Sequence, residues 1–334
     1  MKAAVLHAPR DLRVEATREP SVRSGEVLVR VRAAGVCGTD YRIWSGERPV
    51  RYPLVMGHEF IGEAAAVGEG VTRIRPGERL AIEPNYSCGV CDLCREGQSN
   101  LCLRRTAIGI DVAGGFAELA AVPERCCWPA PDAIAEEQLL LVEPLAVVVR
   151  AVGRGAPRSG ESAAVLGVGT LGLLALQVLR ARGCRVLVLS RSERRLALAR
   201  ELGAEAAAPL GADAGVGAAR AFAGRDGVDL LVETAGTPEA VEVALGLARP
   251  GGRVVLTGLP HAPSSVNFFR VVRRELQILG SMIYQREFGE ALDLLAEGRV
   301  RTAPLITHRF PLEAIADALE THRRPEAIKV AVFP

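Results

Sequence analysis

The stretch Val165-Leu166-Gly167-Val168-Gly169-Thr170-Leu171-Gly172 decides the fold of the second half of this chain. Apolar residues at 163–166 predict a buried strand, and the pattern at 171–181 predicts the helix that follows it. Three glycines spaced as GxGxxG give a tight turn, a close backbone approach to a pyrophosphate, and close packing of helix on strand. GxGxxG alone is weak in a chain with 35 glycines, but its place between strand and helix makes it specific. The segment therefore predicts a dinucleotide site.

The residues around this turn alternate between strand and helix. Apolar runs at 163–166, 186–189, 230–233 and 254–257 predict strands, and helical patterns lie between them at 171–181, 192–202 and 238–248. Such alternation predicts an α/β fold with a doubly wound parallel sheet that helices cover on both faces. From about residue 288 the sequence predicts two more helices and a last strand at 328–333.

The first half of the chain has a different sequence pattern, which predicts short strands separated by turns. Val27, Val29 and Val31 alternate with other residues as in a strand with at least one apolar face, and a turn pattern at 75–78 precedes an apolar run at 79–82. A length of 334 residues suggests about two domains.

Composition narrows the class of protein. The chain is 49% hydrophobic and 24% charged, with a net charge of +2, which excludes wholesale disorder. Because no basic run is present, we expect no nucleic-acid partner. Lys2 and Lys329 are the only lysines, and neither lies in a motif, which argues against lysine chemistry such as a Schiff base.

The expected location is the cytoplasm. The first ten residues lack the apolar core and cleavage site of a secretory signal. The uncharged stretch 162–179 is long enough to raise the question of a membrane span, but its glycines and initial strand favour a soluble strand–turn–helix. Eight cysteines without a signal indicate a reducing compartment, where clustered thiols bind metal more often than they form disulfides.

Four of the cysteines form one cluster, Cys88, Cys91, Cys94 and Cys102. Three at CxxC spacing and a fourth eight residues later can converge on one ion in a small lobe. Four thiolates without a free coordination position are typical of a structural zinc site. Iron–sulfur ligation is an alternative, although its usual spacings differ, and unrelated buried cysteines are another.

Cys37, His58, Glu59 and Glu143 are the other potential metal ligands in informative contexts. Each has an ordinary explanation when taken alone. A single Cys is usually a small core residue, and a single His is more often a hydrogen-bonded group than a ligand. Glu143 precedes Pro144 and could merely cap a helix.

Together these segments carry a resemblance. Gly57-His58-Glu59 with Gly62, Gly68 and Val71 resembles the zinc signature of the medium-chain dehydrogenase/reductase family. The Cys37-Gly38-Thr39-Asp40 segment, the four-cysteine lobe and the Gly-rich turn follow in that family's order. The resemblance covers essentially the whole chain. It implies a mainly β, GroES-like catalytic domain with a structural zinc lobe, interrupted in sequence by a Rossmann domain. The family resemblance thus implies a catalytic domain at 1–150, a dinucleotide-binding domain at 151–285 and a return to the first domain at 286–334.

The resemblance also implies a catalytic zinc held by Cys37 and His58. Glu143 stands where the alcohol dehydrogenase branch has a second Cys, so the chain is similar to the polyol (sorbitol) and threonine dehydrogenase branch. Glu59 belongs to the same site, either as a direct ligand or in exchange with water. Zinc in such a set keeps a position open, where it makes an alcohol easier to deprotonate or polarises a carbonyl.

The resemblance assigns the proton relay to Thr39, with a buried structural threonine as the alternative. Arg42 stands where the family often has an outer relay histidine, so the outer path is left open. Trp44 and Phe116 are candidate walls of the substrate pocket, and an ordinary packing role is the alternative for each.

The predicted cofactor site continues beyond the glycines to the ends of later strands. Ser190 lies at the end of the second strand, where NAD enzymes of this fold generally place the Asp or Glu that binds the ribose 2′-hydroxyl. A hydroxyl and the nearby arginines can instead bind a 2′-phosphate, which predicts NADP rather than NAD. The residues expected to bind the cofactor are Gly167, Gly169, Thr170, Leu171, Gly172, Ser190, Arg191, Arg195, Thr234, Gly258 and Leu259.

The sequence thus predicts a zinc- and nicotinamide-dependent dehydrogenase that interconverts a secondary alcohol and a ketone. A polyol, a sugar derivative or an amino alcohol is the expected substrate class, and the family resemblance suggests a homotetramer or homodimer. A simple alcohol or aldehyde reductase with the same residues is one alternative. A non-catalytic relative that binds zinc and a dinucleotide is the other.

Overall fold

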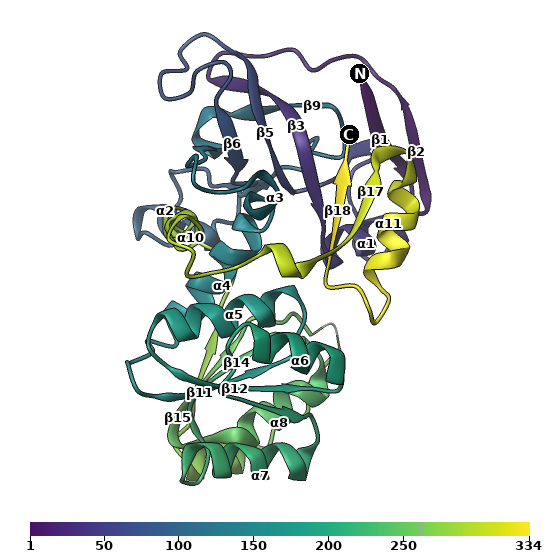
Figure 1. The fold of residues 1–334 in the computed structure, drawn as a ribbon. Helices are drawn as coiled ribbons and strands as arrows, with labels where there is room; N and C mark the ends of the chain where they lie inside the picture. The colour runs from purple at the N-terminus through teal and green to yellow at the C-terminus, as the bar shows by residue number, and fades with distance from the viewer. Residues whose placement is uncertain (261) are drawn as a thin grey trace. The chain divides into compact units, whose positions relative to one another are not determined.

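The computed structural model describes residues 1–260 and 262–334, which form two compact units (Figure 1). The first unit is Met1–Glu143 with Thr302–Pro334, and the second is Pro144–Arg301. The chain therefore passes from one unit to the other after residues 143 and 301, and the domain limits expected from the sequence were 150 and 285. The helix α10 (Glu287–Ala296) belongs to the second unit.

The second unit contains a parallel sheet with the order β13-β12-β11-β14-β15-β16 in the described part of the chain. The first strand in sequence, β11, lies in the middle, and the order turns at β11 and β14. Ligands of such sheets bind at the carboxyl ends of the strands where the order reverses. The strands are β11 Ser162–Leu166, β12 Arg185–Ser190, β13 Ala206–Pro209, β14 Val228–Glu233, β15 Ala248–Leu256 and β16 Gln277–Gly280.

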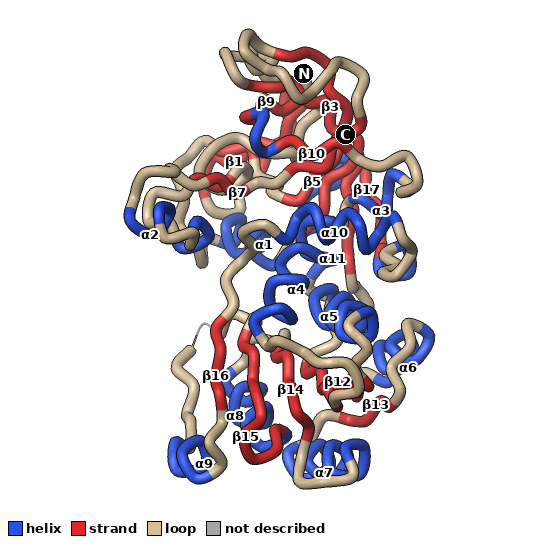
Figure 2. Tube along the Cα trace, turned by 90° about the vertical axis from the view of Figure 1, so that its left-hand side faces the viewer, coloured by secondary structure: helices blue, strands red, loops and turns tan. Residues whose placement is uncertain are grey.

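Helices cover both faces of this sheet (Figures 1 and 2). Ala219 from α7 and Ala240 and Ala244 from α8 pack in one core with sheet residues such as Leu166 and Leu231. α5 and α6 lie on the other face. The bounds are α4 Val142–Arg154, which crosses the limit between the units, α5 Thr170–Ala181, α6 Glu193–Glu201, α7 Ala212–Ala223, α8 Pro238–Leu247 and α9 Phe268–Arg273.

The first unit is mainly β. Its larger sheet has the order β10-β6-β5-β3-β18-β17, with β9 also paired to β3, and smaller sheets are β2-β1-β4 and β7-β8. The last strand, β18, pairs antiparallel with β3, so the two ends of the unit's sequence meet in its central sheet.

The strands of the first unit are β1 Lys2–Ala8, β2 Asp11–Ala16, β3 Glu26–Val36, β4 Leu54–Val55, β5 Glu59–Val67, β6 Arg79–Ile82, β7 Asn85–Tyr86, β8 Thr106–Ala107, β9 Leu119–Pro123, β10 Cys127–Pro129, β17 Ile306–Pro311 and β18 Lys329–Phe333. Its helices are α1 Gly38–Ser45, α2 Asp92–Arg95, α3 Glu136–Leu139 and α11 Ile315–His322, with short 3-10 turns at Ser99–Leu101, Glu124–Cys126, Ala303–Leu305 and Leu312–Ala314.

The predicted fold class, a doubly wound sheet with a GroES-like β domain, is confirmed. Among the described residues, no helix has both the length and the apolar character that crossing a membrane requires.

Candidate metal and dinucleotide sites

The four predicted lobe cysteines converge in the structure. The Sγ–Sγ distances are 3.4 Å between Cys91 and Cys94, 3.8 Å between Cys91 and Cys102, and 3.5 Å between Cys88 and Cys102. Four sulfurs about 2.3 Å from a tetrahedral zinc ion would lie about 3.8 Å apart, so the cluster has the size that zinc requires. The backbone amide of Val90 contributes most to lowering the pKa of the Cys88 thiol, to about 6. Although the backbone amide of Cys94 opposes the change, hydrogen bonds with the neighbouring sulfurs and burial together outweigh it and raise the pKa of Cys91 to about 11.

A second group of side chains that could hold a metal ion comprises Cys37, His58 and Glu59, whose potential ligand atoms lie within 4.8 Å of one another. Cys37 follows the end of β3, and His58 and Glu59 stand at the start of β5. The two strands are antiparallel, and Gly35 pairs with Glu59, so the ladder brings the segments together. A thiol, an imidazole and a carboxylate in one buried corner are the donor types that a catalytic zinc site uses.

Asp40 supports two of these candidate ligands. Its Oδ1 lies 3.2 Å from Nδ1 of His58, and its Oδ2 accepts a 2.8 Å hydrogen bond from the backbone N–H of Cys37. The Asp40 side chain is fully buried. Burial opposes a charge on His58, but the Asp40 carboxylate and Cys37 outweigh it and raise the pKa of His58 well above its usual value. Asp40 thus orients the imidazole ring through Nδ1, and a metal ion would have to displace the proton from the other ring nitrogen to bind there.

Lys329 lies beside Glu59, although the sequence places them 270 residues apart. Its Nζ donates to Oε2 of Glu59 and, at 3.2 Å, to the carbonyl oxygen of Val36. Lys329 is 2% exposed. Burial alone would lower the pKa of Lys329, but Glu59 and Cys37 outweigh it and raise the pKa, so the side chain is charged. The sequence has no motif at Lys329, but the fold places its side chain against Glu59 of the Gly57-His58-Glu59 segment.

Glu143 is not part of the three-residue group that the described residues form. It is buried in the first turn of α4, at the last position of the first unit. Thr39 is half-buried in the first turn of α1, two residues after Cys37. Trp44 and Phe116 are buried in the hydrophobic core of the first unit, which favours the packing role for both.

The Gly-rich turn lies between β11 and α5 as the sequence predicts. Gly167 has φ +94°, and a Cβ there would meet the backbone N of Ala235 at 2.8 Å. A Cβ at Gly172 would meet the Gly167 carbonyl oxygen at 1.9 Å, whereas one at Gly169 would meet nothing within 4 Å. Gly167 and Gly172 thus hold the turn tight, and Gly169 leaves space over the amino end of α5, which begins with Thr170 and Leu171. This cradle suits a pyrophosphate.

The ends of the neighbouring strands carry the remaining predicted cofactor residues. The Thr234 hydroxyl donates to the carbonyl oxygens of Leu166 and Gly167 at 3.1 Å and 3.0 Å, which joins the end of β14 to the turn. Gly258 and Leu259 follow β15, and a Cβ at Gly258 would meet the backbone N of Gly236 at 2.3 Å. Leu259 is 59% exposed, as expected of a residue at the rim of a ligand site.

Ser190 ends β12 and is buried, with its hydroxyl oxygen accepting a 3.1 Å hydrogen bond from the backbone N–H of Ser192. Arg191 is exposed next to it, and Arg195 stands in the first turn of α6, where its backbone N–H donates to Ser192 Oγ. The end of this strand therefore presents a hydroxyl and a guanidinium group rather than a carboxylate.

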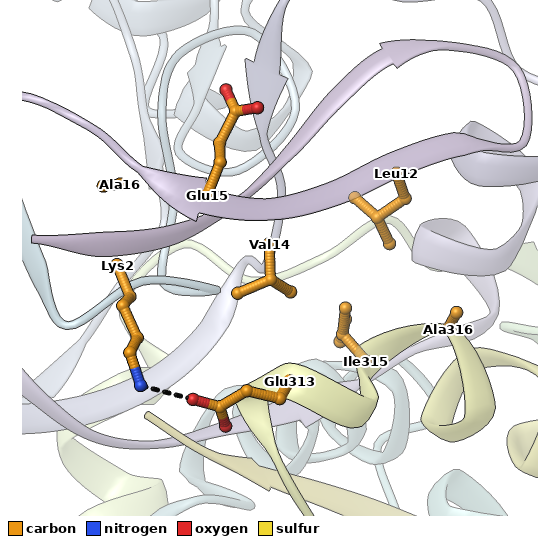
Figure 3. A pocket seen from close by; sticks show the side chains of 8 residues that line it. All are labelled: Lys2, Leu12, Val14, Glu15, Ala16, Glu313, Ile315 and Ala316. Carbon is orange, nitrogen blue, oxygen red and sulfur yellow. Dashed lines mark hydrogen bonds and ion pairs between the residues drawn. The ribbon is translucent and has the colours of Figure 1, made fainter.

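A surface pocket of about 570 Å³ lies elsewhere in the first unit, between β2 and the segment that leads into α11 (Figure 3). Its lining residues are Lys2, Leu12, Val14, Glu15, Ala16, Glu313, Ile315 and Ala316. None of them belongs to the two metal-binding groups.

Comparison with known proteins follows the same division of the chain. Residues 23–132 match the family model described as alcohol dehydrogenase GroES-like domain, and residues 170–297 match zinc-binding dehydrogenase. The sorbitol dehydrogenase of Bacillus subtilis (strain 168) is 33% identical over 100% of this chain and 97% of its own length. The L-threonine 3-dehydrogenase of Bacillus velezensis is 34% identical over 94% of this chain and 93% of its own length.

Solved structures agree. The rspB alcohol dehydrogenase of Escherichia coli CFT073, in complex with NADH, and a protein of Sinorhizobium meliloti 1021, bound to NADP, each superimpose with a TM-score of 0.93. Each is 34% identical and covers 100% of this chain and 99% of its own. The predicted resemblance is thereby confirmed, and the chain belongs to the zinc-dependent alcohol and polyol dehydrogenases of the medium-chain dehydrogenase/reductase family.

Proposed function

We propose that this protein oxidises a secondary alcohol to a ketone, or catalyses the reverse reaction, by moving a hydride between its substrate and NADP(H). The convergence of Cys37, His58 and Glu59 beside a complete set of family motifs carries the proposal. A polyol, a sugar derivative or an amino alcohol is the proposed substrate class, in keeping with the sorbitol and threonine dehydrogenases among its relatives.

Each candidate residue has a defined part in this reaction. Cys37, His58, Glu59 and Glu143 would hold a catalytic zinc, which when bound supplies the electrophile that polarises the substrate oxygen. Asp40 fixes the ring of His58. Thr39 would pass the proton of the substrate hydroxyl toward solvent, a role supported by its position two residues after Cys37. The four lobe cysteines would hold a second, structural zinc that stabilises the loop around them.

The end of β12 supports NADP as the cofactor. An Asp or Glu there would accept hydrogen bonds from both ribose hydroxyls of NAD and would repel a 2′-phosphate. Ser190 and the exposed Arg191 carry no negative charge that would repel the 2′-phosphate of NADP. A guanidinium group can also bind a phosphate through two hydrogen bonds. The related structures contain NADH in one case and NADP in the other, so the argument rests on these residues of the chain itself.

One assay tests the function and both alternatives. Purified protein is supplied with NAD and NADP in turn, together with a panel of polyols, amino alcohols, simple alcohols and the matching ketones and aldehydes. Absorbance of the reduced nicotinamide reports turnover. We expect the highest kcat/KM with a secondary polyol or amino alcohol and NADP. Turnover confined to primary alcohols and aldehydes would favour the simple reductase. A zinc-loaded protein that binds NADPH but turns over nothing in the panel would favour the non-catalytic alternative.

We also propose that the chain forms a homodimer or homotetramer through the β16 edge. β16 pairs only with β15 among the described strands, so its outer backbone groups are free to pair with a second copy (Figure 2). Large apolar side chains are exposed near it, including Phe268, Phe269 and Val272 of α9 and Ile278 of β16. Sedimentation should show a dimer or larger species, and a proline at Leu279 should shift it toward monomer. A monomeric wild-type protein would contradict the proposal.

The cytoplasm is the proposed location. All eight cysteines are unpaired thiols in the structure, as a reducing compartment would keep them. Fractionation of cells that make the protein would test this.

A further inference from the structure

Lys329 and Glu59 come from two strands that flank a third. β18 and β5 both pair with β3, in which Gly35 lies opposite Ala331 on one side and Glu59 on the other. A Cβ at Gly35 would meet Cε of Lys329 at 2.7 Å and Oε2 of Glu59 at 2.8 Å. The missing side chain of Gly35 therefore leaves the space in which the ammonium group crosses β3 and reaches the carboxylate.

The contact is sealed from solvent. The side chains of Lys329 and Glu59 are each 3% exposed, and the Val36 carbonyl oxygen accepts a further hydrogen bond from Nζ. A buried ammonium needs such partners, because an isolated charge in a protein interior is costly. The pair is thus fixed against Gly35 and Val36, the two residues that precede Cys37, beside the place where the three candidate ligands converge.

The two carboxylate oxygens of Glu59 therefore have different surroundings. Oε2 already accepts a bond from the Lys329 ammonium, which makes Oε1 the stronger remaining donor for an ion. A carboxylate without such a partner could bind a cation through both oxygens and fill two coordination positions. It could also bind the cation more strongly through a single oxygen. A zinc site that works on a substrate needs one position open to a small ligand.

We propose that Lys329 is a positioning residue for the metal site: by holding Oε2 of Glu59 across Gly35, it restricts Glu59 to one donor oxygen and keeps a coordination position open for a small ligand. This role rests on the proposed metal site of Cys37, His58 and Glu59. It adds a residue that touches neither substrate nor cofactor in this assignment and acts through Glu59 alone.

The test uses cobalt as a spectroscopic substitute for zinc. Co²⁺ is exchanged into the Cys37 site while zinc stays in the four-cysteine lobe, and the visible spectrum is recorded during titration with imidazole. We expect K329M to show a shifted cobalt spectrum and to bind imidazole at least about tenfold more weakly than the wild type, because Glu59 would fill the open position. The matched control is K2M. Lys2 is the other lysine of the chain, and its 2.6 Å ion pair with Glu313 is exposed (Figure 3), so this variant should behave like the wild type.

A second pair of variants isolates Glu59. Because Lys329 is proposed to act only through Glu59, E59Q and E59Q/K329M should have the same spectrum and the same imidazole affinity. This comparison decides the matter even if K329M alone does not fold, because the double variant removes both buried charges together.

Two results would overturn the role of Lys329: unchanged imidazole binding in K329M, or a clear difference between E59Q and the double variant. A wild-type protein that takes up no cobalt outside the lobe would instead contradict the metal site itself, so the two failures are distinguishable.

Discussion

Oδ1 of Asp40 lies 3.2 Å from Nδ1 of His58, and the other oxygen of the same carboxylate accepts the backbone N–H of Cys37. One buried acid thereby fixes two candidate ligands that come from different strand ends. We expect Asp40→Asn to weaken zinc binding at this site or to reduce turnover by about 10–100-fold, because the ring of His58 loses its charged partner. Competition with a chelator measures the affinity. The control is Asp11→Asn, which removes an exposed acid paired with Arg13. Equal zinc affinity and turnover in Asp40→Asn and wild type would contradict this role.

The two groups of metal ligands should respond differently to loss of one thiol. Cys91→Ser opens a closed site whose binding energy supports folding, so we expect lower thermal stability and a loss of close to one zinc ion per chain. Cys37→Ser should abolish turnover and leave most of the stability. Zinc content, thermal denaturation and activity are measured on each variant. Cys184→Ala, at a buried cysteine outside both groups, should keep its zinc. A Cys91 variant with full stability and unchanged zinc content would show that the lobe is not a structural zinc site.

Glu143 is not among the three residues of that group, and one variant decides its role. As a ligand, or as a partner of bound water, its loss in Glu143→Ala should reduce zinc binding or turnover by about 10–100-fold. As a helix cap it should cost only about 1 kcal/mol of stability, with turnover nearly unchanged. Steady-state kinetics and denaturation of the same preparation distinguish the two results.

Cofactor preference should follow the residue at the end of β12. Ser190→Asp introduces a carboxylate that repels a 2′-phosphate and accepts hydrogen bonds from the ribose of NAD. We expect the ratio of kcat/KM for NADP to that for NAD to fall by at least about tenfold. Arg191→Ala should lower the efficiency with NADP and leave that with NAD nearly unchanged. A wild-type enzyme that is more efficient with NAD would refute the NADP assignment.

Asp229, a buried acid at the start of β14, predicts that the stability of the fold depends on pH. Asp229 Oδ1 accepts from Arg249 and Oδ2 from Ser162, and although burial opposes its charge, these groups and Arg225 lower its pKa from 3.8 to about 2. A lowered pKa in the folded state contributes stability above pH 4 that is lost as the pH falls through 2. The shift corresponds to about 2 kcal/mol. Urea denaturation of wild type and Asp229→Asn should show a difference at pH 5 that shrinks toward pH 2. A constant difference would contradict the prediction.

Local sequence predicted the four inner strands β11, β12, β14 and β15 and the helices α5, α6 and α8, because these elements depend on near neighbours, but it did not predict the edge strands β13 and β16 or the helix α9. The strand, the GxGxxG turn and the helix of β11 and α5 lie within 20 residues, and their apolar pattern and glycine spacing suffice to identify them. α6 and α8 begin close to their predicted starts for the same reason, since Ser192 and Thr237 cap them. α7 was not predicted: its sequence is mostly Ala and Gly, and Gly215 and Gly217 inside it disfavour a helix locally, whereas in the fold Ala219 packs in the core beside the sheet.

The candidate metal ligands could also be predicted from the sequence. Cys88 to Cys102 lie in one short loop, and Cys37, His58 and Glu59 stand in motifs of fixed spacing. Asp40 could also have been predicted. Cys37 is the cap residue before α1, and an acid three residues after a helix cap commonly accepts the backbone N–H of the cap residue. The sequence by itself therefore determined the fold class, the family and the types of donor atom.

Only the tertiary structure decided what surrounds those donors. Lys329 has no local pattern that connects it to Glu59. They meet because β18 returns to pair with β3, which also pairs with β5, and because Gly35 leaves room between them. Strand pairing over such separations depends on the packing of the whole unit, whereas motif spacing depends on a few adjacent residues. For that reason the sequence identified the candidate ligands, and the fold identified the charged side chain that holds one of them.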